Sequence, residues 1–241
     1  MKERLDKYIS SQTALSRKEA QKAIRDKRVT VNGEPCRTPD AKIDTEADSV
    51  SLDGKTLSYA KYVYYMMDKP SGVVSATEDK AERTVIDILP PELVRDGLFP
   101  AGRLDKDTTG LLIITDDGDY AHRMLSPKKH VVKRYIAVLD REPDEEVQRR
   151  FEEGIVLADG TECKSASAVP MGEKLVSVEI SEGKYHQVKR MFAALGYKVV
   201  ALRRVKIGAL ELDPSLSEGD VRIMSEEEAF SVFILSSNKT L

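Results

Sequence analysis

Arg103, Asp105 and Asp107 are crowded into one short loop that precedes an apolar run at residues 111–114. The run has the length of a buried strand, and a turn at 116–118 closes it. An ionised carboxylate on a loop beside a rigid strand can act as a general base or as a nucleophile. The loop is therefore the first candidate for an active site.

Two other patterns compete for these aspartates. Asp105, Asp107 and Thr109 match the Asp-x-Asp-x-Thr pattern of phosphotransferases, but there the aspartate ends a buried strand, whereas here the apolar run follows. A calcium loop would add Gly110 and Asp116, yet its last ligand should be a glutamate and helices should flank it. Both alternatives are therefore disfavoured. We expect Asp107 and Thr109 to shape the loop through side-chain bonds to the backbone.

Four segments in a fixed order resemble the motifs of the RNA pseudouridine synthases, and the RsuA family is the most similar among them. They are Lys69–Ser75, Gly102–Leu112, Lys133–Tyr135 and Glu182–Phe192. With the N-terminal segment included, the resemblance covers essentially the whole chain. It implies an isomerase that breaks the N-glycosidic bond of a uridine, turns the base over and rejoins it through C5. No atom is gained or lost, so no cofactor and no metal are expected.

The resemblance also implies roles for individual residues. Asp105 is the expected catalytic carboxylate, acting either as a nucleophile or as a base. Lys189 is its expected partner, which keeps it charged in a site that excludes water, and Arg190 is the adjacent alternative. Tyr135 would stack on the everted uracil. Arg103 would contact phosphate or fill the gap left by the flipped base.

The first 58 residues are predicted to form a small separate domain. A short amphipathic helix is followed by a second helix that begins at a capping box of Ser16 and Glu19, and then by a hairpin turn at Asn32–Gly33. This order resembles the S4 RNA-binding domain, and the alternative is a helical cap on the larger domain. Its cations would bind phosphates without reading sequence; they are Arg4, Arg17, Lys18, Lys22, Arg25 and Arg28.

The predicted fold class is α+β. A small S4-like domain, 1–58, would precede a catalytic domain, 59–241, with a mainly antiparallel mixed sheet. We expect a linker at 53–60 and a short helix at 84–89. Near the C-terminal end, two separate strands are expected at 199–202 and 205–207.

Charge and composition narrow the class of protein. The net charge of −3 argues against wholesale nucleic-acid binding, but cations gather without acids at 120–134 and 183–210, where they could form a basic face. Only two cysteines, Cys36 and Cys163, are present, which fits a reducing cytosol. No apolar run approaches the length of a membrane helix, and the N-terminus lacks the apolar part of a secretory signal.

These observations predict a cofactor-free and metal-free cytoplasmic enzyme that acts as a monomer, without membrane contact. The resemblance implies small-subunit ribosomal RNA as its partner, with uridine 516 in ribosomal RNA numbering as the target. Two alternatives stay open: a large-subunit ribosomal RNA enzyme of the same family, and a non-catalytic ribosomal RNA-binding assembly factor.

Overall fold

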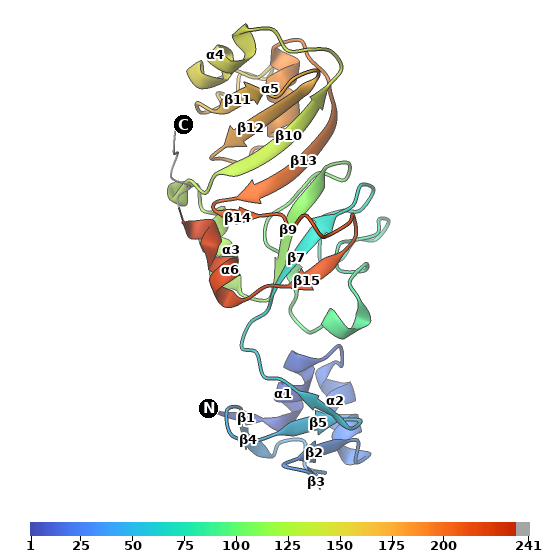
Figure 1. The fold of residues 1–241 in the computed structure, drawn as a ribbon. Coiled ribbons are helices and arrows are strands. Elements are labelled where there is room, and N and C mark those ends of the chain that lie inside the picture. Colours follow the sequence, from blue (N-terminus) through green and yellow to red (C-terminus); the bar gives the residue numbers. More distant parts are fainter. Residues whose placement is uncertain (235–241) are drawn as a thin grey trace. The chain divides into compact units, whose positions relative to one another are not determined.

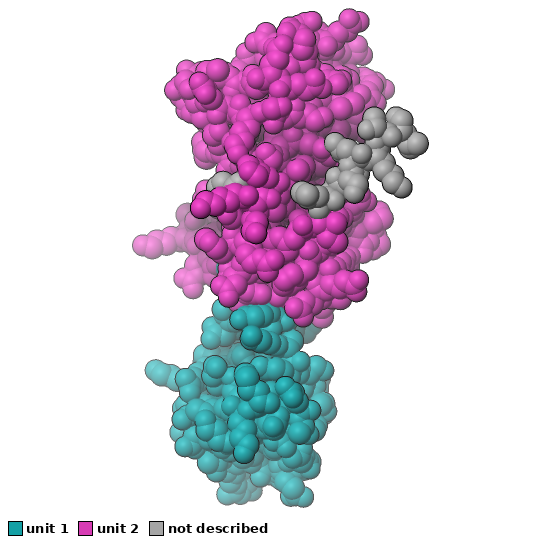
Figure 2. All heavy atoms as spheres, turned by 90° about the vertical axis from the view of Figure 1, so that its left-hand side faces the viewer, with its two compact units in different colours: residues 1–63, 89–99 teal, residues 64–88, 100–241 magenta. Residues whose placement is uncertain are grey.

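A computed structural model describes residues 1–234, and the chain divides into two compact units (Figures 1 and 2). The first unit comprises residues 1–63 and 89–99, and the second comprises residues 64–88 and the chain from residue 100 onward. Arg95 ties the returning segment to the first unit, because its guanidinium donates to the carbonyl oxygens of Ala60 (3.2 Å) and Lys61 (3.3 Å). The domain boundary at residue 58 stays a prediction.

The first unit contains two helices and two small sheets, and the predicted capping box is present at its second helix. Ser16 accepts a hydrogen bond from the Glu19 backbone, and the Glu19 carboxylate accepts one in return. Leu5, Ile9 and Ile24 are fully buried in its core. The helices are α1 (Leu5–Gln12) and α2 (Arg17–Arg25). The smaller sheet pairs β1 (Lys2–Arg4) with β4 (Lys42–Asp44). The larger sheet contains, in spatial order, β3 (Glu34–Pro35), β2 (Val29–Val31), β5 (Val50–Leu52) and β6 (Lys55–Leu57).

The expected linker at 53–60 is wrong. Asp53 and Gly54 both have positive φ, 50° and 79°, and form the two-residue turn of a hairpin. The hairpin joins β5 to β6, so residues 55–57 add the fourth strand to the sheet.

The second unit is built on one mixed sheet, and every neighbouring pair along it is antiparallel except β9 with β13. The predicted α+β class with a mainly antiparallel sheet is therefore confirmed. In spatial order its strands are β11 (Ser167–Pro170), β12 (Leu175–Ile180), β10 (Lys133–Leu139), β13 (Val199–Ile207), β9 (Thr109–Thr115), β7 (Tyr64–Lys69) and β15 (Val221–Ile223), with β14 (Leu210–Glu211) beside β13. The two-residue strand β8 (Phe99–Pro100) lies where the chain passes from the first unit to the second.

Two pairs of helices cover this sheet (Figure 1). Beside its β10–β12 part, Phe151 and Phe192 pack with ring centres 4.9 Å apart and join α4 (Glu146–Glu153) to α5 (Gln187–Ala194). Near β7, the Tyr120 hydroxyl donates to the Ala229 carbonyl (2.8 Å) and joins α3 (Gly118–Leu125) to α6 (Glu226–Phe230). Short 3-10 helices occupy Pro91–Leu93, Pro127–Lys129 and Ser231–Phe233. Within residues 1–234, no helix is both long and apolar enough to cross a bilayer.

Two further predictions about elements are wrong. Residues 84–89 form a turn and not a helix. Thr84 and Asp87 bond to each other's backbone N–H groups (2.8 and 3.2 Å), as at a helix start, but Pro90 and Pro91 follow directly and prevent a helix from continuing. The two strands expected at 199–202 and 205–207 are one continuous strand, β13. Its two central arginines interrupt the apolar pattern but not the strand.

Candidate active site

Four residues from four strands lie side by side in one row across the sheet. Tyr135 on β10 pairs with Arg204 on β13, Arg204 pairs with Gly110 on β9, and Gly110 pairs with Lys69 on β7. Neighbouring strands are about 4.8 Å apart, so the row spans about 15 Å. The sheet thus gathers residues from three motifs that are far apart in sequence.

Gly110 allows the two parallel strands of this row to meet. Its φ is 101°, and a Cβ at this position would collide with the carbonyl oxygen of Arg204 on β13. A glycine is therefore required where the candidate loop enters β9, which explains its place in the second motif.

Lys69 lies fully buried beneath the candidate loop. Its Nζ donates to the carbonyl oxygens of Pro70 (2.9 Å), Thr108 (3.1 Å), Asp105 and Lys106 (both 3.3 Å). Burial lowers the pKa of Lys69 to about 8, although nearby carboxylates oppose this change. One ammonium thus holds three backbone carbonyls of the loop that carries Asp105.

The rest of the first motif also supports the loop. The buried Ser75 hydroxyl donates to the Leu104 carbonyl (2.9 Å) and accepts from the Leu104 N–H (3.1 Å). The Gly72 N–H donates to the Lys106 carbonyl (2.8 Å). The segment from Lys69 to Ser75 is therefore a scaffold for the Asp105 loop.

The Asp105 carboxylate is 26% exposed and faces two side chains from the fourth motif. Lys189 Nζ lies 3.4 Å from its Oδ2, and His186 Nε2 lies 3.5 Å from its Oδ1. Lys189 also lies 2.5 Å from Asp107 Oδ1, and this contact lowers the pKa of Asp107. The structure therefore brings Asp105 and Lys189 together as expected. It also gives Asp107, which was expected only to shape the loop, the shorter of the two contacts.

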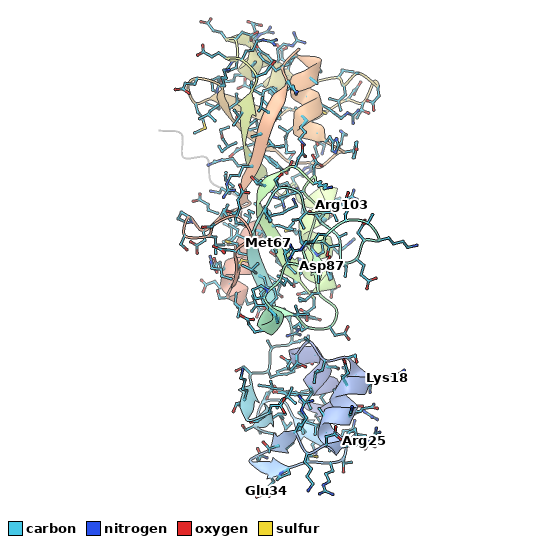
Figure 3. All side chains as sticks on the ribbon, turned by 90° about the vertical axis from the view of Figure 1, so that its right-hand side faces the viewer. Lys18, Arg25, Glu34, Met67, Asp87 and Arg103 are labelled. Carbon is cyan, nitrogen blue, oxygen red and sulfur yellow. The ribbon has the colours of Figure 1, made fainter. Side chains whose placement is uncertain are left out.

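Two other predicted site residues lie at the border of this cluster. Arg190 pairs with Asp159 (2.5 Å), so the alternative pairing of Arg190 with Asp105 is not formed. Arg103 lies exposed on the loop (Figure 3), and it makes no ion pair or hydrogen bond through its side chain in the described part of the chain. Arg103 is thus available to an external anion.

Tyr135 is 8% exposed, and its ring lies 6.0 Å from the guanidinium carbon of Arg204. Its hydroxyl makes no hydrogen bond among the described residues. Arg204 is 4% exposed and donates to the Leu111 carbonyl (2.8 Å), while one of its Nη atoms is buried without a partner in residues 1–234. Lys133 is the second cation here, and burial lowers its pKa to about 8.

The sequence patterns did not indicate Arg204 or Lys133 as site residues. The only signal for Arg204 was the acid-free run at 183–210, which was interpreted as a possible basic face. A basic face does not include two of its cations, because Arg203 pairs with the buried Asp68 (2.5 Å) and Arg204 is buried.

The cations predicted for RNA binding in the first unit fall into two groups. Arg4 and Arg17 both contact Asp6 (2.9 and 3.4 Å), and Arg28 pairs with Asp53 (2.5 Å). The other three are exposed on α2 and form no ion pair within the described ranges; they are Lys18, Lys22 and Arg25, two of which are labelled in Figure 3. We call this second group the free α2 cations.

The two competing interpretations of the loop fail on its geometry. Asp105 precedes β9 and does not end a strand, unlike the phosphotransferase aspartate. Seven residues of extended strand separate the loop from Asp116, about 23 Å, so one calcium ion could not bind at both ends. Among the described residues, no three His, Cys, Asp or Glu side chains form a group that could hold a metal ion.

Comparisons with known proteins agree with this arrangement. The RNA pseudouridylate synthase family model matches residues 63–194, and the S4 domain model matches residues 3–49. Ribosomal small subunit pseudouridine synthase A of Escherichia coli is 42% identical over 231 residues, covering 95% of this chain and 99% of the relative. The uncharacterized RNA pseudouridine synthase YtzG of Bacillus subtilis is 42% identical over 229 residues, covering 93% and 96%.

A solved structure of a pseudouridylate synthase superposes with a TM-score of 0.67 at 40% identity, covering 95% of this chain and 99% of the other. The chain therefore belongs to the RNA pseudouridine synthases, in the RsuA family that its motifs predict, with an S4 domain near its N-terminus.

Proposed function

We propose that this enzyme converts a uridine of small-subunit (16S) ribosomal RNA to pseudouridine, at uridine 516 in ribosomal RNA numbering. The proposed RNA is supported by the 42% identity to the E. coli relative, whose name specifies the ribosomal small subunit. The observation that carries the proposed chemistry is the position of Asp105, on a loop that Lys69 holds from below and opposite Lys189 and His186.

The reaction exchanges one bond for another. The bond between N1 of uracil and C1′ of ribose breaks, the base turns over, and C5 bonds to C1′; C5 then loses a proton and N1 gains one. Asp105 is the proposed catalytic carboxylate. Attack on C1′ and removal of a ribose proton both need it ionised, and the Lys189 ammonium 3.4 Å away is its counter-ion.

Tyr135 is proposed to lie against the everted uracil. A base stacked on an aromatic ring is stabilised by about 1–3 kcal/mol, which offsets part of the few kcal/mol that base flipping costs. Its hydroxyl, which makes no hydrogen bond within residues 1–234, can take part in removing the C5 proton. Arg103 is proposed to contact phosphate or to fill the space left by the base, whereas Arg190 would have to leave Asp159 to contact RNA.

The S4 domain is proposed to supply affinity for the RNA backbone. The free α2 cations can bind phosphates directly. Arg4, Arg17 and Arg28 would have to exchange an acidic side chain for phosphate. The monomeric state and the cytoplasmic location stay predictions.

The test is to incubate the purified chain with transcripts of small-subunit and large-subunit ribosomal RNA and to map pseudouridine in each. We expect one product, in the small-subunit RNA, at the proposed uridine. Product in the large-subunit transcript alone would reject the proposed substrate. Product in neither transcript, nor in assembly intermediates of either subunit, would favour the non-catalytic assembly factor.

A further inference from the structure

Tyr185 presents an exposed aromatic ring next to the candidate active site. The residue is 72% exposed, and its ring stacks on the imidazole of His186 with 3.8 Å between ring centres and 20° between planes. His186 Nε2 lies 3.5 Å from Asp105 Oδ1. One face of the tyrosine ring is therefore covered by His186, and the opposite face is open.

The backbone that carries this ring pair is fixed in an unusual conformation. His186 has φ 46° and ψ 36°, a left-handed geometry that costs free energy in any residue other than glycine. Gln187, only 4% exposed, stabilises it: Gln187 Oε1 accepts from the Lys184 N–H (2.9 Å), and Nε2 donates to Glu182 (2.7 Å). These partly buried hydrogen bonds hold the strained residue, and such strain is found at functional sites as well as in turns.

The surroundings hold Tyr185 in place but leave its ring without a partner on the outer side. Arg190 donates to the Tyr185 carbonyl (3.3 Å), while the Tyr185 hydroxyl makes no hydrogen bond in the part of the chain that the structure describes. Proteins that bind single-stranded RNA use such exposed, rigid aromatic rings to stack bases.

We propose that the outer face of Tyr185 binds the nucleobase of a nucleotide adjacent to the target uridine. This inference rests on the proposed function, because it requires RNA in the site. Eversion of the uridine leaves its neighbour without a stacking partner, and the Tyr185 ring replaces that partner. The base, the Tyr185 ring and the His186 imidazole then form one stack, and His186 contacts the Asp105 carboxylate. The stack determines which nucleotide reaches that carboxylate.

The test measures the affinity of wild type, Tyr185→Ala and Tyr185→Phe for a small-subunit RNA fragment that spans the proposed target. Two further fragments lack the base on the 5′ or the 3′ side of that uridine. Tyr185→Ala should bind the intact fragment about 5- to 150-fold more weakly, the range for loss of one stacked base. It should bind one of the abasic fragments as well as wild type does, and Tyr185→Phe should restore most of the affinity for intact RNA.

Val200→Ala is the control for loss of an exposed apolar side chain, since Val200 is 63% exposed near the start of β13. Its affinity should equal that of wild type. Equal affinity of Tyr185→Ala and wild type for intact RNA would overturn the inference. So would an equal loss on all three fragments, because that pattern indicates a structural role. The affinity measurement does not depend on catalytic activity. The proposed function is tested separately, by whether wild type forms pseudouridine on the intact fragment.

Discussion

Replacing Lys69 with methionine tests whether one buried ammonium holds the loop that carries Asp105. The Lys69 Nζ donates to four carbonyl oxygens, and those of Asp105, Lys106 and Thr108 belong to the loop. Methionine has a similar length and suits a buried position, but it has no proton to donate. The variant should therefore fold, and the loop that carries Asp105 should lose its order.

Two opposing effects determine how much Lys69→Met changes the free energy of unfolding. The fall in the pKa of Lys69 from 10.5 to about 8 means that burying the charge costs the folded state about 3 kcal/mol at pH 7, which methionine removes. The Asp105 and Lys106 carbonyls keep a second donor, the N–H groups of Thr108 and Gly72, so methionine removes the donor of two carbonyls, those of Pro70 and Thr108. Each carbonyl left buried without a donor costs about 1–3 kcal/mol, which gives a loss of about 2–6 kcal/mol. This loss is comparable to the gain, and opening the loop to water avoids most of it. We therefore expect a displaced loop and only a small change in the free energy of unfolding.

The assay is the rate of pseudouridine formation together with urea unfolding. A displacement of about 1 Å at a reacting group lowers kcat by about 100-fold, and we expect a loss of that order. Lys106→Met is the matched control. Among residues 1–234 the Lys106 side chain pairs only with the exposed Glu82 (2.7 Å), so the kcat of this variant should stay close to wild type. A wild-type kcat in Lys69→Met would refute the role given to the ammonium.

Deprotonation of Lys69 at high pH should change kcat and the free energy of unfolding in opposite directions. Above pH 8 Lys69 becomes a neutral amine with one proton fewer to donate, so kcat should fall between pH 7 and 9. Its folded-state pKa lies below the unfolded value of 10.5, so the free energy of unfolding should rise by up to about 3 kcal/mol as pH rises from 8 to 10.5. Lys133 titrates in the same range, so each curve is compared with that of Lys69→Met, which retains Lys133.

Three further outcomes are expected. Gly110→Ala should lower the free energy of unfolding by about 3 kcal/mol or more in urea, because its Cβ would collide with β13; a smaller loss would show that the strands can separate without cost. Tyr135→Phe should keep RNA affinity and lower kcat at least about tenfold if the hydroxyl assists proton transfer; equal rates would show that only the ring matters. Alanine at the three free α2 cations should reduce the slope of log Kd against log salt by about 2, and an unchanged slope would exclude α2 from the RNA interface.

The motifs predicted which segments meet at the site, but not how deeply each residue is buried. Lys69 precedes a proline, which indicates a surface turn, and only the pairing of β7 with β9 beneath the loop encloses its side chain. Asp105 and Asp107 are two residues apart and equally able to reach Lys189, so the conformation of the loop decides which contact is shorter.

Local signals predicted elements well where one signal acted alone. The capping box of Ser16 and Glu19 fixes the start of α2 without tertiary contacts. Thr84 and Asp87 form the same pair of bonds, but Pro90 and Pro91 follow directly, and the expected helix does not form. The left-handed His186 could not be predicted, because its conformation depends on the buried Gln187 beside it.

The most direct measurement of the central claim uses Asp105→Asn, which removes the charge and keeps the shape of the side chain. Pseudouridine formation is followed in a single turnover with excess enzyme, and the Kd for the same RNA is measured in parallel. Asp107→Asn is the matched control, since it changes the neighbouring carboxylate by the same atoms. We expect Asp105→Asn to bind RNA like wild type and to form no pseudouridine, while Asp107→Asn retains turnover. Turnover by Asp105→Asn at a rate near that of wild type would contradict the account.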